Sequence, residues 1–395
     1  MITGFLIGIG FKANAKERCV LNLAHCGSQL SVVVYVDDLL ITCADAVGVD
    51  WLIGQLRERF VDITVCKGKK HSYLGQTFDF TVPGSVAVNM EGYTEDLLGM
   101  RATEKSAVTP ALEGLFEVDG TSPLLPERAA ADFHSIVAKA FYLAQRARPD
   151  LLTTAAFLTT RVGQPTVQDD EKLSRMLRYL HGTKEMGIRL GKGGPGPMLV
   201  TAYVDASYGV HSDFKSHTGV VITAGQGPVY VGSRKQKVVS KSSTEAELIG
   251  ISDALSQVIW TRDFLIEQGY EVGPARLQQD NQSTMVLANK GIFTSEKTRH
   301  IGIRFFWVKD RIESGEVAIV YFPTEEMVAD IMTKPLQGAL FRKMRSLLMQ
   351  WDFIRGRPIL SFLFSMTKCC GTWCLDWSWV LIEGIIGIEG LVAVL

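Results

Sequence analysis

The chain has 395 residues, 47% of them hydrophobic, and its formal net charge is −1. This length is enough for two or three domains with separate cores. The balanced charge means that any basic surface for nucleic acid has to be local. The spacing of the seven cysteines excludes a paired zinc site and a disulfide framework, which indicates a reducing compartment. The N-terminal residues show no secretion signal.

The first 92 residues combine strand and helix patterns. Residues 32–42 read VVVYVDDLLIT, in which two aspartates separate two apolar, β-branched runs. This pattern predicts a hairpin of buried strands with Asp37 and Asp38 at its turn. A plain turn explains the pair, because Asp hydrogen-bonds nearby backbone, but adjacent carboxylates at a tight turn can also hold Mg²⁺. Apolar residues at helical spacing predict a helix over 47–60.

A helical region and a linker follow. Residues 93–190 look helical throughout, and their apolar stripes fit a protein core better than a cofactor contact. The run GKGGPGP at 191–197 predicts a linker, because glycine and proline interrupt regular structure. Beyond it, the alternation of strands and helices indicates an α/β domain with a mixed sheet. Strands are expected at 198–206, 219–224, 228–232, 275–280 and 316–322, and a long helix at 244–268.

Four carboxylates stand out by their position after the linker. Asp205 ends an expected strand, and Glu247 shares the apolar, inward face of the long helix. Asp280 follows another strand, and Asp330 lies early in a helix that Thr324 could cap. Each one alone also fits a turn, a cap or a solvated surface. Together they could converge at one sheet edge, where they would repel one another unless a cation lay among them.

Nine motifs connect these observations. They are YVDDLLIT, SYLGQ, ARPDLLTTAAFLT, RYLHGTKEMG, AYVDAS, SSTEAEL, QDNQST, TRHIGIR and VADIMTKPL, in that order along the chain. In this order the motifs resemble the reverse transcriptase–ribonuclease H end of a Ty/copia-type retrotransposon Pol polyprotein. The resemblance implies an α/β protein in which an α+β palm and thumb remnant precedes a ribonuclease H-like mixed five-stranded sheet with flanking helices.

The resemblance also implies a division into domains. Residues 1–92 would be the C-terminal part of the palm, 93–190 a helical thumb or connection, and 198–349 a ribonuclease H domain. The apolar tail at 350–395 fits neither domain, and we expect it to be disordered or not authentic. Charged residues interrupt this tail, which argues against a membrane span.

At matching positions, the resemblance implies roles for individual residues. The four carboxylates would hold two Mg²⁺ ions, with Mn²⁺ as an alternative, for hydrolysis of the RNA strand of an RNA–DNA hybrid. Basic residues could contact the substrate, although lysine-bearing loops are usually only solvated and a lone histidine is usually structural. These candidates are Lys235, Lys237, Lys241 and His300. Near His300, Gly302 stands where the family usually has an acidic residue.

The polymerase site is expected to be incomplete. In the family, Asp37 and Asp38 would act with a third carboxylate on an earlier palm strand, but Glu17 is the first acidic residue of this chain. We therefore expect the pair to be a structural remnant in this chain. Upstream polyprotein segments, including the rest of the palm and an integrase, are the expected protein partners. No small-molecule cofactor and no membrane are expected.

Two alternatives remain open. The chain could be an inactive retroelement remnant or an adopted nucleic-acid-binding module. It could also be an integrase-type transposase, although that class carries its glutamate late in the fold, whereas Glu247 lies in the first long helix of this domain. The expected location is the cytoplasm or nucleus, or a virus-like particle if the element is active.

Overall fold

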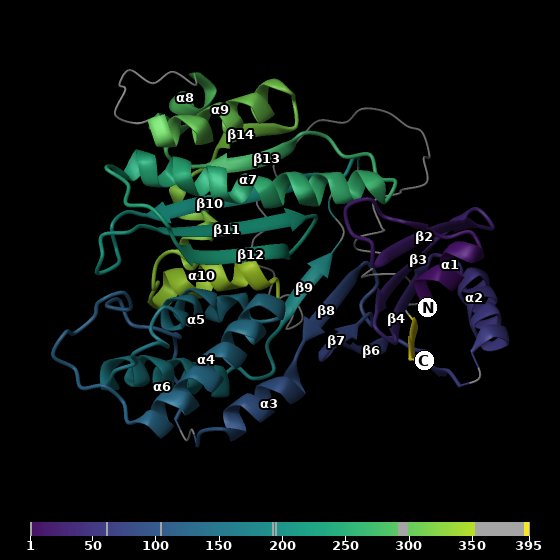
Figure 1. Cartoon of the computed structure of the whole chain (residues 1–395), viewed down its shortest axis with the longest axis horizontal. Coiled ribbons are helices and arrows are strands. Elements are labelled where there is room, and N and C mark those ends of the chain that lie inside the picture. Colours follow the sequence, from purple (N-terminus) through teal and green to yellow (C-terminus); the bar gives the residue numbers. More distant parts are fainter. Residues whose placement is uncertain are drawn as a thin grey trace.

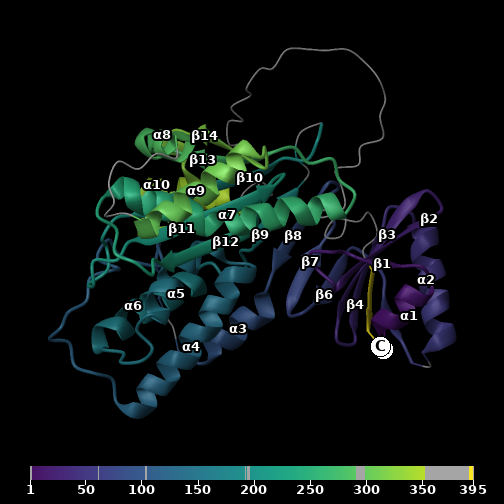
Figure 2. The ribbon, with the colours of Figure 1, turned by 45° about the horizontal axis from the view of Figure 1, so that its top comes forward.

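The computed structural model describes residues 2–351, apart from 61, 103–104, 192, 194–195 and 291–298, together with 391–394. Helices and strands are interleaved along the chain, so the expected α/β class is confirmed. The described strands form three sheets (Figure 1). A six-stranded sheet at the N-terminus is followed by a four-stranded sheet and then by a five-stranded sheet that lies between layers of helices (Figure 2).

The N-terminal sheet has the strand order β1-β2-β3-β4-β15-β5. Strands β3 and β4 form the expected hairpin, in which Tyr35 pairs with Asp38 across a two-residue turn. Helices α1 and α2 pack on this sheet through the buried side chains Leu6 and Leu52, and the helix expected over 47–60 is confirmed as α2. The bounds are α1 Ile2–Gly8, β1 Lys12–Ala13, β2 Val20–His25, β3 Ser28–Tyr35, β4 Asp38–Cys43, α2 Ala46–Arg59 and β5 Thr64–Cys66.

Strand β15 (Leu391–Val394) comes from the other end of the chain. It lies antiparallel between β4 and β5, and its Val394 pairs with Asp38. Of the tail expected at 350–395, residues 352–390 and 395 lie outside the described residues.

The middle of the chain is less helical than its sequence indicates. Residues 105–126 contain no helix, because prolines and glycines recur through this segment, and the region ends in strand β9, which closes the four-stranded sheet β6-β7-β8-β9. The expectation of helix throughout 93–190 is therefore wrong. The bounds are β6 Lys70–Tyr73, β7 Gln76–Asp79, β8 Ser85–Asn89, α3 Glu91–Gly99, α4 Glu127–Arg146, η1 Pro149–Leu151, α5 Leu152–Thr159, α6 Val167–His181 and β9 Ile188–Gly191.

The five-stranded sheet has the order β12-β11-β10-β13-β14. Strands β10, β11 and β12 are antiparallel, whereas β10, β13 and β14 run parallel. The expected ribonuclease H-like mixed sheet is thus confirmed. The bounds are β10 Val200–Ser207, β11 His217–Ala224, β12 Pro228–Lys235, α7 Ser243–Glu267, β13 Ala275–Gln279, α8 Gln282–Lys290, α9 Arg299–Glu313, β14 Val317–Tyr321 and α10 Gly338–Met349.

Both faces of this sheet are covered. On one face, Val204 and Ile222 pack against α7 residues such as Leu255. On the other face, Val221 and Val231 belong to the same core as the helices α4 to α6 and α10, and Figure 1 shows these helices below β12. The core therefore continues across the Gly/Pro segment at 191–197, and the helices before it support the sheet after it.

A short segment between β14 and α10 completes the sheet edge. It forms two 3₁₀ turns, η3 (Thr324–Glu326) and η4 (Val328–Met332), where the sequence predicts a helix capped by Thr324. That expectation is wrong, because Met327 has an extended backbone (φ −65°, ψ 91°) that separates the two turns. Among the described residues, no helix combines the length and apolar character needed to cross a bilayer.

Candidate metal centre at the edge of the five-stranded sheet

Three acidic side chains meet at one edge of the five-stranded sheet. Asp205 lies near the end of β10, and Asp280 directly follows the neighbouring parallel strand β13. Because parallel strands end at the same edge, these two carboxylates come together. Glu247 joins them from the start of α7, where the Ser242 side chain caps the helix. One carboxylate oxygen from each of Asp205, Glu247 and Asp280 lies within 4.8 Å of the others.

Asp330 reaches the same edge through a lysine. The Lys334 ammonium lies 2.8 Å from Asp330 Oδ1 and 3.4 Å from Asp205 Oδ2. Asp330 is buried in η4. The structure therefore brings all four sequence-predicted carboxylates to one edge, with Lys334 between two of them. Lys334 was not among the predicted site residues, although its spacing of four residues from Asp330 is a signal that could have revealed it.

Glycine at position 219 allows η4 to approach the sheet at this point. Gly219 is paired with Asp205 across β10 and β11. A Cβ atom at this position would lie 2.6 Å from Met332 Cβ and 2.9 Å from the Ala329 carbonyl oxygen. Real Cβ atoms do not approach other atoms so closely, so any larger residue would push η4, and with it Asp330, away from Asp205.

Neighbouring polar groups fix the orientation of the carboxylates. The Thr333 hydroxyl donates a hydrogen bond to Asp205, and the Thr324 hydroxyl donates to Asp280 Oδ2 at 2.9 Å. A longer contact of 3.4 Å joins Gln279 Nε2 to Glu247 Oε2. These partners hold side chains whose mutual repulsion would otherwise separate them.

The charges at this edge are poorly compensated. Burial, together with the negative charges of Asp205 and Asp280, raises the pKa of Glu247 well above its usual value. Burial and the charge of Asp205 raise the pKa of Asp330 to about 6, although Lys334 opposes the shift. One ammonium group does not neutralise four carboxylates. A set of hard oxygen ligands with excess negative charge suits a divalent cation such as Mg²⁺.

Asp37 and Asp38 occupy a different place. They lie at the tip of the β3–β4 hairpin, where Asp37 is exposed and Asp38 half-buried. Among the described residues, only Asp205, Glu247 and Asp280 form a group of three acidic, histidine or cysteine side chains close enough to hold a metal ion. The hairpin pair therefore has no third ligand within the described part of the chain.

The predicted substrate-contacting residues have mixed surroundings. Lys235 is paired with Asp213 at 2.8 Å. Lys237 and Lys241 are exposed in the loop that leads from β12 to α7, close in sequence to Glu247. The side chain of His300 lies outside the described residues.

The order of strands and the acidic edge together define a ribonuclease H-like fold. No family model matches the chain. The sequence does match the Retrovirus-related Pol polyproteins from transposons RE2 and RE1 of Arabidopsis thaliana. It is 30% identical to the first over 345 residues, which are 86% of this chain. To the second it is 30% identical over 351 residues, or 87% of this chain. The chain is a relative of Ty/copia-type retrotransposon Pol polyproteins, as its motifs predict.

The match covers only part of these relatives. The chain spans 23% of the length of each of the two Arabidopsis polyproteins. Among solved structures, a ribonuclease H1 isolated from compost is similar to 34% of this chain over 91% of its own length. That pair has a TM-score of 0.26 and a sequence identity of 17%.

Proposed function

We propose that this chain hydrolyses the RNA strand of RNA–DNA hybrids, with divalent cations held by Asp205, Glu247, Asp280 and Asp330. The observation that carries the proposal is the convergence of buried carboxylates from separate elements. Asp205 is 3% exposed and Glu247 6% exposed, and burial of several negative charges is unfavourable unless a cation compensates them. The relationship to retrotransposon Pol polyproteins makes a nucleic-acid phosphate the fitting substrate.

The residues of the site would have different roles. Asp205, Glu247 and Asp280 would hold a cation together, because one carboxylate oxygen of each lies within 4.8 Å of the others. Asp330 would help to hold a cation beside Asp205, to which Lys334 joins it, and Thr333 would fix the orientation of Asp205. Magnesium ions bound there would make water a better nucleophile and stabilise the leaving 3′ oxygen in an in-line displacement.

Recognition of the hybrid would depend on shape and backbone. The 2′-hydroxyl groups distinguish RNA from DNA at a given site. The exposed Lys237 and Lys241 lie on the loop that enters α7, where they could bind phosphates near the cut. Asp37 and Asp38 take no part in this reaction, because they belong to another sheet.

The test is cleavage of an RNA–DNA hybrid, labelled on its RNA strand, by the full chain in Mg²⁺. The sequence offers a matched pair of variants on α7. Glu247→Gln removes a buried carboxylate from the cluster, whereas Glu245→Gln makes the same change two residues away, where the carboxylate accepts a hydrogen bond from the Lys241 amide. We expect Glu247→Gln to lower the cleavage rate by about 10²-fold or more, and Glu245→Gln to remain within about threefold of wild type, since it loses only one exposed hydrogen bond.

Two results would contradict the proposal. One is equal activity in the two variants. The other is a folded wild-type chain that binds the hybrid but never cuts it in Mg²⁺ or Mn²⁺, and this result would support a nucleic-acid-binding module without catalysis.

A further inference from the structure

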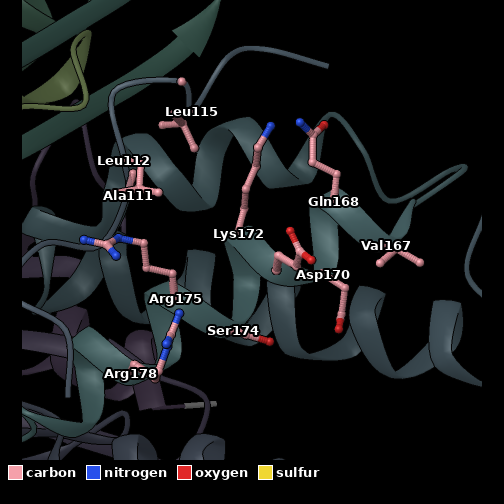
Figure 3. Close-up of a pocket in the computed structure, with 12 residues that line it drawn as sticks. Ala111, Leu112, Leu115, Val167, Gln168, Asp170, Lys172, Ser174, Arg175 and Arg178 are labelled. Carbon is pink, nitrogen blue, oxygen red and sulfur yellow. The ribbon is translucent and has the colours of Figure 1, made fainter. Parts of the chain in front are cut away.

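A pocket of about 750 Å³ lies on the helical region, outside the acidic site. One wall is a face of α6 and the other is the segment around Ala111 and Leu115 (Figure 3). Lys172, Arg175 and Arg178 lie three residues apart along that face of the helix. Figure 3 shows the two arginines at the end of the pocket away from Val167 and Gln168.

Within the described part of the chain, the two arginines have no acidic partner. No hydrogen bond or ion pair joins the Arg178 guanidinium to any described residue, and Arg175 reaches only the Thr109 hydroxyl, at 3.0 Å. Burial and the nearby charge of Arg178 lower the pKa of Arg175. Two guanidinium groups that repel each other at the edge of a pocket form a site that an anion would stabilise.

The other charged side chains of the pocket differ in their surroundings. Asp170 is paired with Arg101 at 2.8 Å, and the Lys172 ammonium donates to the Glu117 carbonyl. Glu171 lies four residues before Arg175, but it makes no ion pair with it among the described residues. Positive charge at one end of the pocket is thus left for an external ligand.

The pocket is connected to the acidic edge. Thr109, the partner of Arg175, donates to Gln337 Oε1 at 3.1 Å, and Gln337 Nε2 donates to the Ala111 carbonyl at 3.0 Å. Gln337 follows Lys334 by three residues, in the segment that leaves η4 for α10. The wall of the pocket is therefore joined by hydrogen bonds to the segment that contacts Asp205 and Asp330.

We infer that Arg175 and Arg178 form a second contact for nucleic acid, which binds a backbone phosphate of the strand engaged at the acidic edge. Arginine is suited to this task, because its planar guanidinium matches the oxygens of a phosphate. The identity of the strand rests on the proposed function, whereas the presence of an anion site rests on the pocket alone. The shared core fixes the distance between the helical region and the five-stranded sheet. The arginine pair and the acidic edge would therefore hold a stiff duplex in one alignment.

The test measures binding without cleavage. A fluorescein-labelled RNA–DNA hybrid is titrated with the full chain in EDTA, and anisotropy gives the dissociation constant at several salt concentrations. In Arg178→Gln we expect a dissociation constant about five- to tenfold higher at low salt, and a slope of log K against log salt that is smaller by about 0.9. Glutamine forms helices well, so α6 should persist, and circular dichroism checks this.

Two comparisons show whether the site itself is responsible. Arg57→Gln removes one exposed arginine from α2, on the N-terminal sheet, and should change the dissociation constant less than twofold. Glu171→Gln removes the unpaired carboxylate of the pocket and should strengthen binding about twofold.

Isothermal titration with inorganic phosphate then distinguishes a site for free phosphate from a site for the phosphates of nucleic acid. We expect inorganic phosphate to bind with a millimolar dissociation constant, far more weakly than the hybrid. Arg178→Gln should abolish this binding of phosphate.

The inference would be overturned if folded Arg178→Gln kept the wild-type dissociation constant and salt slope, or if Arg57→Gln weakened binding equally. Failure of the proposed function would look different, because hybrid binding that depends on Arg178 would persist in EDTA while cleavage in Mg²⁺ was absent.

Discussion

Two acidic sites lie at strand ends in this molecule, and they differ in how they are assembled. Asp37 and Asp38 are adjacent in sequence and lie at a hairpin tip that solvent reaches. Asp205, Glu247 and Asp280 come from two strands and a helix, and two of them are almost fully buried. Solvated aspartates at a turn need no explanation beyond turn geometry, whereas buried carboxylates in contact persist only where a cation or a function compensates their repulsion.

The largest effect that separates the two sites concerns cleavage. Asp205→Asn preserves the shape of the side chain and removes its charge, so we expect loss of about 10²-fold or more in the rate of hybrid cleavage. Asp37→Asn makes the same change at the hairpin and should leave the rate within about twofold, as expected for an exposed substitution away from special features. Single-turnover cleavage of a labelled hybrid measures both, and an equal loss in the two variants would remove the distinction between the sites.

The elements of the five-stranded sheet could be predicted because their patterns are local. The apolar strand that ends at Asp205 and the long helical pattern of α7 are read directly from the sequence. The β3–β4 hairpin was predicted for the same reason. By contrast, residues 105–126 lack a regular period, and their turns follow prolines and glycines that interrupt the helical pattern of the region.

Contacts between distant segments could not be predicted in the same way. Nothing near Gly219 in the sequence shows that η4 will lie against it, because the close approach to Met332 depends on the complete fold. Lys334 has a local signal in its spacing from Asp330, but its contact with Asp205 spans more than a hundred residues. The sequence therefore predicts which carboxylates gather more readily than it predicts what surrounds them.

The second prediction concerns the dependence of stability on pH. The pKa of Asp330 is about 6 in the folded chain and should be near 3.8 when unfolded, so the folded state binds more protons between about pH 4 and 6. The free energy of unfolding should therefore fall as the pH rises through this window, by on the order of 2 kcal/mol from this group alone. In Asp330→Asn this fall in the free energy of unfolding should be absent, because asparagine does not ionise. Lys334 keeps Asp205 as a partner in the variant.

Urea unfolding of wild type and Asp330→Asn measures this effect. The free energies of unfolding of the two proteins should be closest near pH 4. Between pH 4 and about pH 6 the variant should become more stable than wild type, and above pH 6 the difference should stay constant. Mg²⁺ at pH 7.5 should stabilise the wild type more than the variant, because a ligand that binds only the folded state shifts unfolding by mass action. A difference that does not vary with pH would show that burial and the charge of Asp205 do not raise the pKa of Asp330.

The smallest expected effect concerns the cation that the chain supplies itself. The Lys334 ammonium lies between Asp205 and Asp330, where it would repel a divalent ion that needs the same oxygens. Lys334→Met keeps most of the length of the side chain and removes the charge, so we expect the Mg²⁺ concentration for half-maximal cleavage to fall about fivefold, equivalent to about 1 kcal/mol of repulsion at the partly solvated edge. Lys343→Met is the matched control, because among the described residues its exposed ammonium on α10 contacts only the Glu325 carbonyl.

The direction of the Lys334 result separates two accounts of this residue. A lower Mg²⁺ requirement in Lys334→Met, with Lys343→Met unchanged, would mean that the lysine competes with the metal and stands in for it when none is bound. A higher requirement would mean that Lys334 moves aside and helps to hold the substrate phosphate instead, which would contradict the prediction. In the absence of Mg²⁺, Lys334→Met should be less stable than wild type, because Asp205 and Asp330 then lose the positive charge between them.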